Sequence, residues 1–159
     1  MSASWVVRMA VATDVPDIAR LSRDRIEQGL GWSWTPARVQ RSLCDPQTNV
    51  IVAASDLAMH GFGIMKYRDE DAHLLLLAVR PSSCRCGVGG AVLTWLEQVA
   101  RVAGIGRIQL EVRRSNAGAQ AFYARLGYRA AQVLPGYYQG VEAGVRLAKD
   151  LHRVQVGPA

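Results

Sequence analysis

The chain lacks any long hydrophobic segment. Its longest uninterrupted apolar run covers residues 74–79 of 159, whereas a helix that spans a membrane needs about 20 apolar residues. The first residues also lack a basic segment followed by an apolar one, so the sequence predicts no secretory signal. We therefore expect a cytoplasmic protein that does not act in a membrane.

Cysteine is scarce as well. Three cysteines are present, Cys44, Cys84 and Cys86. An odd number in a chain without an export signal argues against a disulfide framework. The spacing of Cys84 and Cys86 is not the C-x-x-C of structural zinc sites, and the three histidines are not paired in the sequence. We expect no metal site, and the default interpretation of each cysteine is a small apolar residue.

Long blocks of one charge are missing too, although the chain is basic overall. Its 19 lysines and arginines exceed its 13 acidic residues by six, but no block of five or more like charges occurs. The excess favours a polyanionic partner, which could be nucleic acid, the ribosome or a phosphorylated ligand. Because the charges are scattered, we expect no direct contact with nucleic acid. The length and the 50% hydrophobic content suit one domain over residues 1–159, with a frayed tail after about Leu151.

The apolar pattern predicts an α/β protein. Alternation and turn residues predict strands over residues 5–10, 50–54, 62–67, 73–79, 107–113, 128–134 and 142–149. Caps and helical periodicity predict helices over about 14–29, 35–44, 88–103 and 116–126. Residues 135–140 are expected to form the loop between the last two strands.

Three of these elements carry detailed expectations. Strand 73–79 is nearly all leucine, which is typical of a central strand that is buried on both faces. Helix 88–103 has apolar residues at 88, 91, 92, 95, 96, 99 and 103, opposite Thr94, Glu97, Gln98 and Arg101. Strand 107–113 alternates, so Ile108, Leu110 and Val112 should share one face and leave Glu111 on the other.

A glycine-rich loop joins strand 73–79 to the strongest predicted helix. It reads Cys84-Arg85-Cys86-Gly87-Val88-Gly89-Gly90. Amide groups at a helix N-terminus bind phosphate, and glycines let the ligand approach the main chain. The loop has neither the P-loop pattern nor the dinucleotide G-x-G-x-x-G. A tight turn without a ligand remains the alternative.

Two side chains after this helix are suited to acid–base chemistry. Glu111 lies on the polar face of its strand, and Tyr123 lies on the next helix. A carboxylate and a phenol so placed can act as base and acid. The alternative is ordinary packing, with Glu111 paired to Arg113 and Tyr123 half-buried beside Phe122.

The chain resembles the GCN5-related N-acetyltransferases, the GNAT family, from Val6 to about Leu151. The loop Cys84-Arg85-Cys86-Gly87-Val88-Gly89 is similar to the family's Q/R-x-x-G-x-G/A, with cysteine in place of the leading Arg or Gln. A second signature is formed by Asn116, Ala119, Phe122, Tyr123, Gly127 and Tyr128. Within the family, Glu111, Tyr123, Gly136-Tyr137-Tyr138 and Glu142 look most like the ribosomal-protein N-terminal alanine acetyltransferases. Glu142-Ala143-Gly144 departs from that group's Glu-Asp-Ala.

The resemblance implies a fold, a co-substrate and a set of site residues. The implied fold is a mixed, mostly antiparallel sheet of six or seven strands with about four helices, in which a splayed strand pair binds acetyl-CoA. The implied cofactor-binding residues are Leu77, Ala78, Val79, Arg85, Cys86, Gly87, Val88, Gly89, Gly90, Asn116 and Tyr123. Glu111 would be the base through water, with a pKa that burial raises, and Tyr123 the acid. Trp32, Trp34, Tyr137 and Tyr138 would form the walls of the acceptor site.

The expected function is therefore acetyl transfer from acetyl-CoA to a primary amine. An α-amine is freed of its proton at a cost roughly 3 kcal/mol lower than that of a lysine side chain, which favours the N-terminus of a protein or peptide as acceptor. A small-molecule or lysine acetyltransferase is one alternative. A non-catalytic CoA-binding or ribosome-associated module is another. We expect a monomer or a homodimer.

Overall fold

The computed structural model describes residues 4–84 and 86–152. In this part of the chain, seven strands form a sheet with the order β1-β2-β3-β4-β5-β7-β6. The strands are β1 (Val6–Met9), β2 (Thr48–Ala54), β3 (Met59–Tyr67), β4 (Asp71–Val79), β5 (Arg107–Arg113), β6 (Arg129–Tyr138) and β7 (Glu142–Asp150). The helices are α1 (Val15–Arg25), α2 (Pro36–Cys44), α3 (Val88–Val102) and α4 (Ala117–Arg125), with short 3-10 turns η1 (Ala12–Asp14) and η2 (Pro81–Ser83). The expected mixed sheet with four helices is confirmed.

The chain forms two compact units. The first contains the described residues up to Lys66 together with Leu74–Gln98, and the second contains Tyr67–His73 and the described residues from Val99 onward. Strand β4 and helix α3 each contribute residues to both units. That the chain is one domain, and that a splayed strand pair binds acetyl-CoA, stay predictions.

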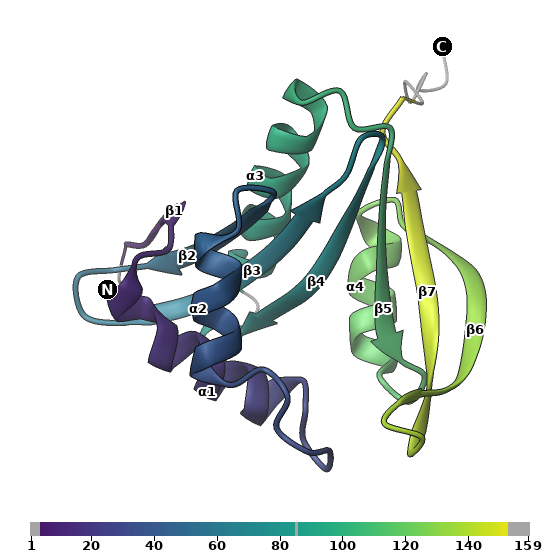
Figure 1. Ribbon diagram of the computed structural model, residues 1–159, viewed down its shortest axis with the longest axis horizontal. Helices are drawn as coiled ribbons and strands as arrows, with labels where there is room; N and C mark the ends of the chain where they lie inside the picture. Colours follow the sequence, from purple (N-terminus) through teal and green to yellow (C-terminus); the bar gives the residue numbers. More distant parts are fainter. Residues whose placement is uncertain (1–3, 85, 153–159) are drawn as a thin grey trace. The chain divides into compact units, whose positions relative to one another are not determined.

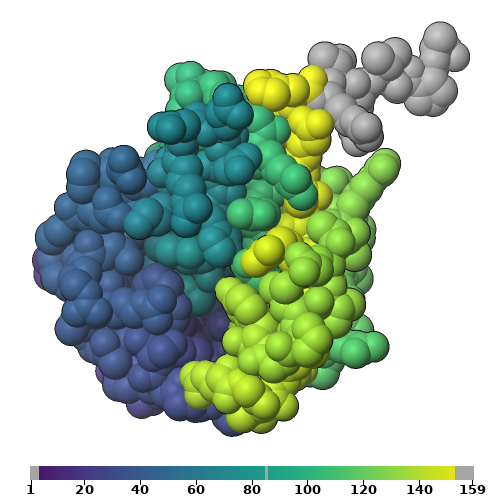
Figure 2. Space-filling view, turned by 45° about the vertical axis from the view of Figure 1, so that its right-hand side comes forward, coloured from purple at the N-terminus to yellow at the C-terminus, as the bar shows by residue number. Residues whose placement is uncertain are grey.

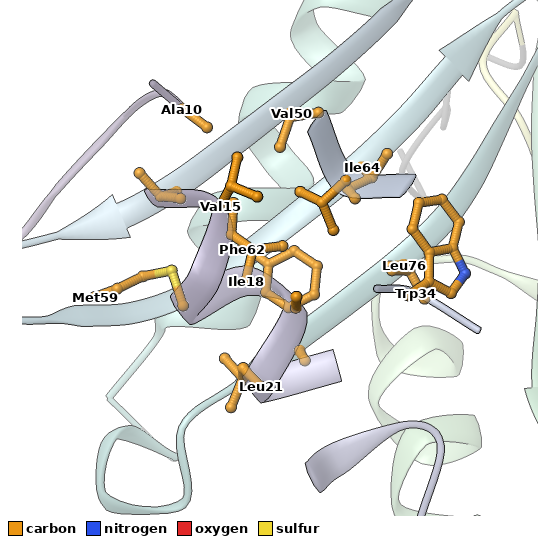
Figure 3. Close-up of a cluster of buried hydrophobic side chains, with 14 of the residues drawn as sticks. Ala10, Val15, Ile18, Leu21, Trp34, Val50, Met59, Phe62, Ile64 and Leu76 are labelled. Carbon is orange, nitrogen blue, oxygen red and sulfur yellow. The ribbon is translucent and has the colours of Figure 1, made fainter. Parts of the chain in front are cut away.

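The first unit is a helix-covered antiparallel sheet. β1 pairs with β2 and β2 with β3, both antiparallel. α1 and α2 lie on one face of these strands (Figure 1). Figure 3 shows the core between the helices and the strands, which includes Ile18 and Leu21 of α1 and Phe62 and Ile64 of β3. Burying such side chains stabilises the fold by about 1.5–3 kcal/mol each.

Local sequence explains where these two helices begin. Pro16 lies in the first turn of α1, and Pro36 begins α2. The Thr35 hydroxyl accepts a hydrogen bond from the amide of Arg38 at 3.4 Å, which caps α2. The predicted start and end of α2 are confirmed, whereas α1 ends at Arg25 and not near Gly29.

Helix α3 packs against two glycines of β3. A Cβ on Gly63 would lie 2.8 Å from a methyl of Val92 and 2.9 Å from one of Leu96, and a Cβ on Gly61 would lie 2.9 Å from a methyl of Val88. Distances under 3.0 Å are not tolerated between carbon atoms. The absence of side chains at 61 and 63 therefore lets α3 approach the sheet closely.

The buried face of α3 is rotated from the predicted one. Val88, Val92 and Leu96 are buried as expected, but so are residues 93, 97 and 100, while residue 103 is exposed. Glu97, which we expected on the polar face, is only 8% exposed. The reason is that Gly61 and Gly63 of β3 leave room for residues 88, 92 and 96, so this row of α3 contacts the sheet. The adjacent residues 93, 97 and 100 are then buried as well.

Strand β4 also differs from expectation. Ala72, Leu74, Leu76 and Ala78 are buried, but the alternate residues 73, 75, 77 and 79 are only half-buried. The all-leucine composition suggested burial on both faces, whereas one face keeps partial access to solvent.

The second unit contains an antiparallel β5-β7-β6 arrangement. β5 pairs with β7 and β6 with β7. Ile108, Leu110 and Val112 are buried, which confirms the predicted alternation of β5. Figure 1 shows α4 behind these strands, and Figure 2 shows the surface that the β6 segment (light green) presents to solvent.

The predicted loop at residues 135–140 is wrong in its bounds. β6 continues to Tyr138, and a register shift between Leu134 and Tyr138 absorbs Pro135 and Gly136. Gly136 has φ +64°, a backbone conformation that residues with a side chain rarely adopt. It lies within the irregularity of β6, in a segment that we expected to be a loop. The turn itself covers residues 139–141. Across the described residues, none of the helices combines the length and apolar character required to span a membrane.

Candidate functional site

The glycine loop before α3 leaves open space beside its main chain. Cys84, Cys86 and Gly87 are exposed, and Gly87 has φ +79°. A Cβ on Gly87 or Gly90 would meet nothing within 4 Å. The first amides of α3 have no partner within the helix, so they point to a region where an anion can bind. Arg85 lies outside the described residues.

A cation that the sequence did not single out lies beside this loop. The Arg25 guanidinium, at the end of α1, donates from Nη2 to the sulfur of Cys84 at 3.9 Å. The Cys84 thiol in turn donates to the carbonyl of Arg80 at 3.5 Å. The family's cationic or amide side chain is absent at position 84, but Arg25 brings a positive charge to the same place. No local signal in the sequence links residues 59 apart.

The end of β4 is held tightly against β3. The amide of Arg80 donates to the carbonyl of His60 at 2.8 Å, and a ring nitrogen of His60 lies 2.8 Å from the Ser83 hydroxyl. Ala78 is buried, and Leu77 and Val79 are half-buried. These contacts fix the strand end and the start of the loop, the two stretches that the family resemblance assigns to acetyl-CoA.

Glu111 lies at the centre of a charged cluster in the second unit. Its Oε2 is 2.5 Å from Nε2 of His73, on β4. Its Oε1 accepts hydrogen bonds from Nη2 and Nε of Arg146, on β7, at 3.0 and 3.3 Å. The alternative in which Glu111 pairs with Arg113 is therefore wrong.

These contacts overturn the expected direction of the Glu111 pKa. Burial raises the pKa of Glu111, but the hydrogen bonds and charges of His73 and Arg146 together outweigh burial and hold the pKa below its usual range. We expected burial to raise it toward neutrality. The carboxylate of Glu111 is instead ionised throughout the neutral pH range. In this state it accepts hydrogen bonds and stabilises the positive charge of its neighbours.

Tyr123 is buried among aromatic rings on α4. Its ring contacts Phe122 at a centroid distance of 5.0 Å and Tyr128 at 5.6 Å, both edge to face. It is more deeply buried than the half-buried position we expected. Burial, with a smaller contribution from the charge of Tyr138, raises the pKa of Tyr123 well above its usual range. The phenol therefore keeps its proton.

Two further tyrosines come together with Glu111. Tyr137 and Tyr138 end β6, and their rings pack edge to face at 5.0 Å. Burial and then the charge of Glu111 raise the pKa of Tyr137, which is 45% exposed. Burial, then Tyr137 and Glu111, raise the pKa of Tyr138 well above its usual range. The second unit thus gathers Glu111, Tyr123, Tyr137 and Tyr138, four of the predicted site residues.

The two predicted tryptophans belong to the first unit. Trp32 is 40% exposed, donates from Nε1 to the carbonyl of Ala19 at 3.2 Å, and lies under the Arg23 guanidinium. Trp34 is a buried member of the core, with Arg38 3.9 Å above its ring. Trp34 also lines a shallow pocket of about 240 Å³ with Arg38 and Lys66. Trp32 is the more accessible of the two rings.

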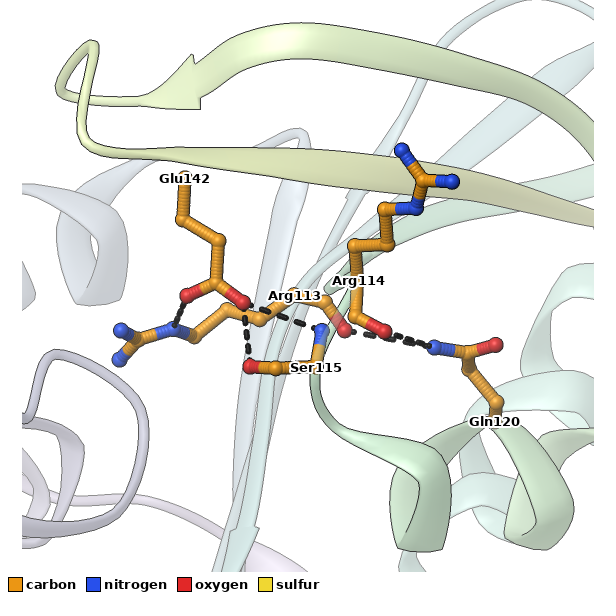
Figure 4. A network of polar contacts seen from close by, with 5 residues as sticks. All are labelled: Arg113, Arg114, Ser115, Gln120 and Glu142. Atoms are coloured by element: carbon orange, nitrogen blue, oxygen red, sulfur yellow. Dashed lines mark hydrogen bonds and ion pairs between the residues drawn. The ribbon is translucent and has the colours of Figure 1, made fainter.

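Glu142 and Asn116 organise the segment between β5 and α4. Glu142, at the start of β7, binds Nε of Arg113 at 2.6 Å, the amide of Ser115 at 3.0 Å, and the Ser115 hydroxyl (Figure 4). Oδ1 of Asn116 accepts from the amide of Ala119 at 3.0 Å and caps α4. The side-chain oxygen of Asn116 is therefore used within the protein, and its amide N–H groups remain to donate.

Comparisons with known proteins converge on one family. Residues 17–128 match the family described as Acetyltransferase (GNAT) family. The chain is 39% identical over 80 residues to an uncharacterised N-acetyltransferase of Methanocaldococcus jannaschii, a match that covers 50% of this chain and 51% of the relative. It is 38% identical over 80 residues to the [ribosomal protein bS18]-alanine N-acetyltransferase of Escherichia coli K12, covering 50% and 54%. The chain thus spans about half the length of these curated relatives.

The fold has close counterparts among solved structures. The crystal structure of the ribosomal-protein-S18-alanine N-acetyltransferase from Escherichia coli superposes with a TM-score of 0.80 at 24% identity. The superposition covers 98% of this chain and 99% of that one. At this identity the likeness establishes the fold.

Proposed function

Because the chain belongs to the GNAT acetyltransferase family, we propose that it transfers the acetyl group of acetyl-CoA to a primary amine. The observation that carries this proposal is the glycine loop before α3. Gly87 and Gly90 have open space where a side chain would stand, next to the first amides of α3. These residues fit the pyrophosphate of CoA, which needs close main-chain donors.

We further propose that the acceptor is the N-terminal α-amine of a protein or peptide. The curated relative of Escherichia coli is named an alanine N-acetyltransferase of ribosomal protein bS18. Because the alanine side chain has no amine, this name is in keeping with an α-amine acceptor. The chemistry agrees, since an α-amine titrates near pH 8 and a lysine near 10.4, so the neutral nucleophile is much more abundant for an α-amine at neutral pH. Tyr137, which belongs to the same unit as Glu111, offers exposed aromatic surface for the residues that follow the amine.

In this proposal Glu111 and Tyr123 serve the proton transfers. The ionised Glu111 draws the proton from the amine through water, while the amine nitrogen bonds to the acetyl carbon and the carbon–sulfur bond breaks. Tyr123, which stays protonated, donates a hydrogen bond to the departing thiolate and delivers its proton to it. The phenolate of Tyr123 then takes a proton from solvent, and Glu111 releases to solvent the proton that it received from the amine.

The test is release of free CoA thiol over a panel of amines. The panel contains peptides that begin with Ala or Ser, the same peptides with a blocked N-terminus and an internal lysine, and small amines. We expect release with the free N-terminal peptides. Release only with lysine or with small amines would contradict the acceptor proposal. Thermal stabilisation by CoA without thiol release from any amine would mean a non-catalytic module.

Two substitutions test the assigned roles. Glu111→Gln and Tyr123→Phe should each lower kcat/KM for the best acceptor by about 10²–10⁴-fold. Glu70→Gln is the matched control, because Glu70 is an exposed turn residue of the same type. If both site variants keep wild-type kcat/KM, the roles are wrong.

A further inference from the structure

Both oxygens of Glu111 are already engaged. Oε2 contacts His73 and Oε1 receives two hydrogen bonds from Arg146. The Glu111 side chain is 5% exposed, whereas the His73 side chain is 24% exposed. A water or an amine that approaches this cluster therefore meets the imidazole before it meets the carboxylate.

The geometry points to a proton-accepting pair in which Nδ1 of His73 receives the proton of the acceptor amine and Glu111 holds the imidazole in place. This inference rests on the proposed function and changes which atom of that site takes the proton. Glu111 becomes a positioning residue, which orients the ring and stabilises the imidazolium that forms.

The contact between the two side chains selects the tautomer. An ionised carboxylate only accepts hydrogen bonds, so Nε2 of His73, at 2.5 Å, must carry a hydrogen. In a neutral imidazole the other nitrogen, Nδ1, is then the free base. Across residues 4–84 and 86–152, no hydrogen-bond partner is found for Nδ1, so its lone pair is available.

Base strength favours histidine over glutamate for this task. An ordinary carboxylate titrates about two pH units below an ordinary imidazole, so it is a roughly 100-fold weaker base. The partners of Glu111 move its pKa further down. A carboxylate in that state suits the same supporting role that it plays beside histidine in other acid–base pairs.

The charges around His73 are compatible with this role. Besides Glu111, the cluster contains Arg146 of β7 and Tyr137 of β6. On its own strand, His73 follows the exposed Asp71 by two residues. Arg146 engages Glu111 through Oε1 and leaves Oε2 to the imidazole.

The protons balance over one turnover. The amine nitrogen bonds to the acetyl carbon and gives its proton to Nδ1, while the carbon–sulfur bond breaks and the thiolate takes the proton of Tyr123. The imidazolium then releases one proton to solvent, and the phenolate of Tyr123 takes one from solvent. The products are the N-acetylated amine and free CoA.

The test compares pH profiles of kcat/KM for wild type, His73→Gln, Glu111→Gln and the double variant. Gln at 73 keeps an N–H donor toward Glu111 but has no basic nitrogen. We expect His73→Gln to lose about 10²–10⁴-fold and to lose an ionisation limb that wild type shows. The acceptor amine ionises in the same way with every variant, so only a difference between the pH profiles of two variants reports on an ionising group of the protein. The double variant should lose no more than the larger single loss, because the pair acts as a unit.

His152→Gln is the matched control, since it makes the same change at an exposed histidine. It should keep the wild-type profile. Thermal stabilisation by CoA should be unchanged in His73→Gln, which separates a lost proton acceptor from a damaged fold. Nitrogen NMR of the histidines at pH 8 should show Nε2–H and a bare Nδ1 for His73.

The outcomes separate this inference from the proposed function. If wild type releases CoA thiol but His73→Gln keeps the limb and loses less than about 10-fold, His73 is only a structural partner. An Nδ1–H tautomer at His73 overturns the inference whatever the activity. If wild type releases no thiol with any amine, the proposed function fails and the role of His73 fails with it.

Discussion

Glu142 shows how one side chain joins three elements. It accepts hydrogen bonds from Arg113 of β5 and from the amide and hydroxyl of Ser115, just before α4. The hydrogen bonds from Ser115, then that from Arg113, lower the pKa of Glu142 to about 2. Its contribution to stability therefore depends on pH.

The sign of that dependence follows from the lowered pKa. A carboxyl group whose folded pKa is depressed stabilises the fold above its unfolded pKa, near 4.5, and loses this contribution as the pH falls toward about 2. Glu142→Gln should thus be less stable than wild type at pH 7, and the difference should shrink below about pH 4.5. Urea denaturation at pH 7, 4 and 3 measures it.

A matched control is Glu70→Gln, at an exposed turn position, where the difference from wild type should stay small at every pH. A Glu142→Gln difference that is as large at pH 3 as at pH 7 would show that the three hydrogen bonds do not depend on the charge of the carboxylate.

The sequence identified Glu111 but not its partners. Arg113 is two residues along the same strand and faces the same side, which made it the obvious partner. The residue directly opposite Glu111 in the β5–β7 ladder is Arg146, and directly opposite side chains are closer than diagonal ones. His73 and Arg146 are 38 and 35 residues away, so only the strand register brings them together.

At the scale of elements, α4 depends on its cap. Asn116→Ala removes the acceptor for the amide of Ala119, so it should lower the free energy of unfolding by about 0.5–2 kcal/mol. Asn116→Asp keeps an acceptor and should stay near wild-type stability. Because Asp lacks the N–H donors, it should still raise KM for acetyl-CoA if Asn116 donates to the pantetheine. Urea denaturation and acetyl-CoA kinetics separate the two roles.

If Asn116→Asp is as destabilised as Asn116→Ala, the cap is not the stabilising contact. Gly118→Ala provides a control within α4, since a Cβ there meets only Asn116 Oδ1 at 3.8 Å. That variant should be at least as stable as wild type, because alanine favours a helix over glycine.

Elements whose ends are set by local chemistry were predicted well. Thr35 and Pro36 begin α2, and Asn116 and Gly127 bound α4, where Gly127 has φ +95°. Two of the errors arose where distant residues decide the structure. The rotated face of α3 depends on glycines in β3, and the continuation of β6 past Pro135 depends on pairing with β7.

At the scale of the molecule, the net charge of +6 would attract the proposed co-substrate acetyl-CoA, which is anionic. Attraction between the basic protein and CoA is screened by salt, so KM for acetyl-CoA should rise with ionic strength. Arg25, beside Cys84, should supply part of it, and Arg25→Gln should raise this KM by about 2- to 5-fold. KM for the acceptor should stay unchanged. Steady-state kinetics at low and moderate salt measure both effects.

Arg107→Gln makes the same charge change at an exposed residue of β5 and should leave KM for acetyl-CoA within about twofold of wild type. Cys84→Arg restores the family's cation and should lower that KM. If Arg25→Gln has no effect, the amides of the loop suffice without Arg25.

The order of the seven strands was not predicted, because it could not be derived from the residues. Alternation predicts that a segment is a strand, but the partner of each strand depends on contacts far along the chain. The same holds for the site, where motifs located Glu111 and Tyr123 but the burial that raises the pKa of Tyr123 depends on the packing around α4.

Gly61 limits how this protein can evolve. A Cβ at this position would lie 2.9 Å from a methyl of Val88, at the start of α3, and 3.0 Å from the carbonyl oxygen of Ala78, near the end of β4. A side chain at Gly61 would therefore displace both the end of β4 and the start of α3, the two stretches that the family resemblance assigns to acetyl-CoA. Adaptation toward tighter or looser binding of acetyl-CoA is therefore easier at exposed positions such as Cys84 and Arg25, where a change of side chain leaves the contact beneath the loop intact.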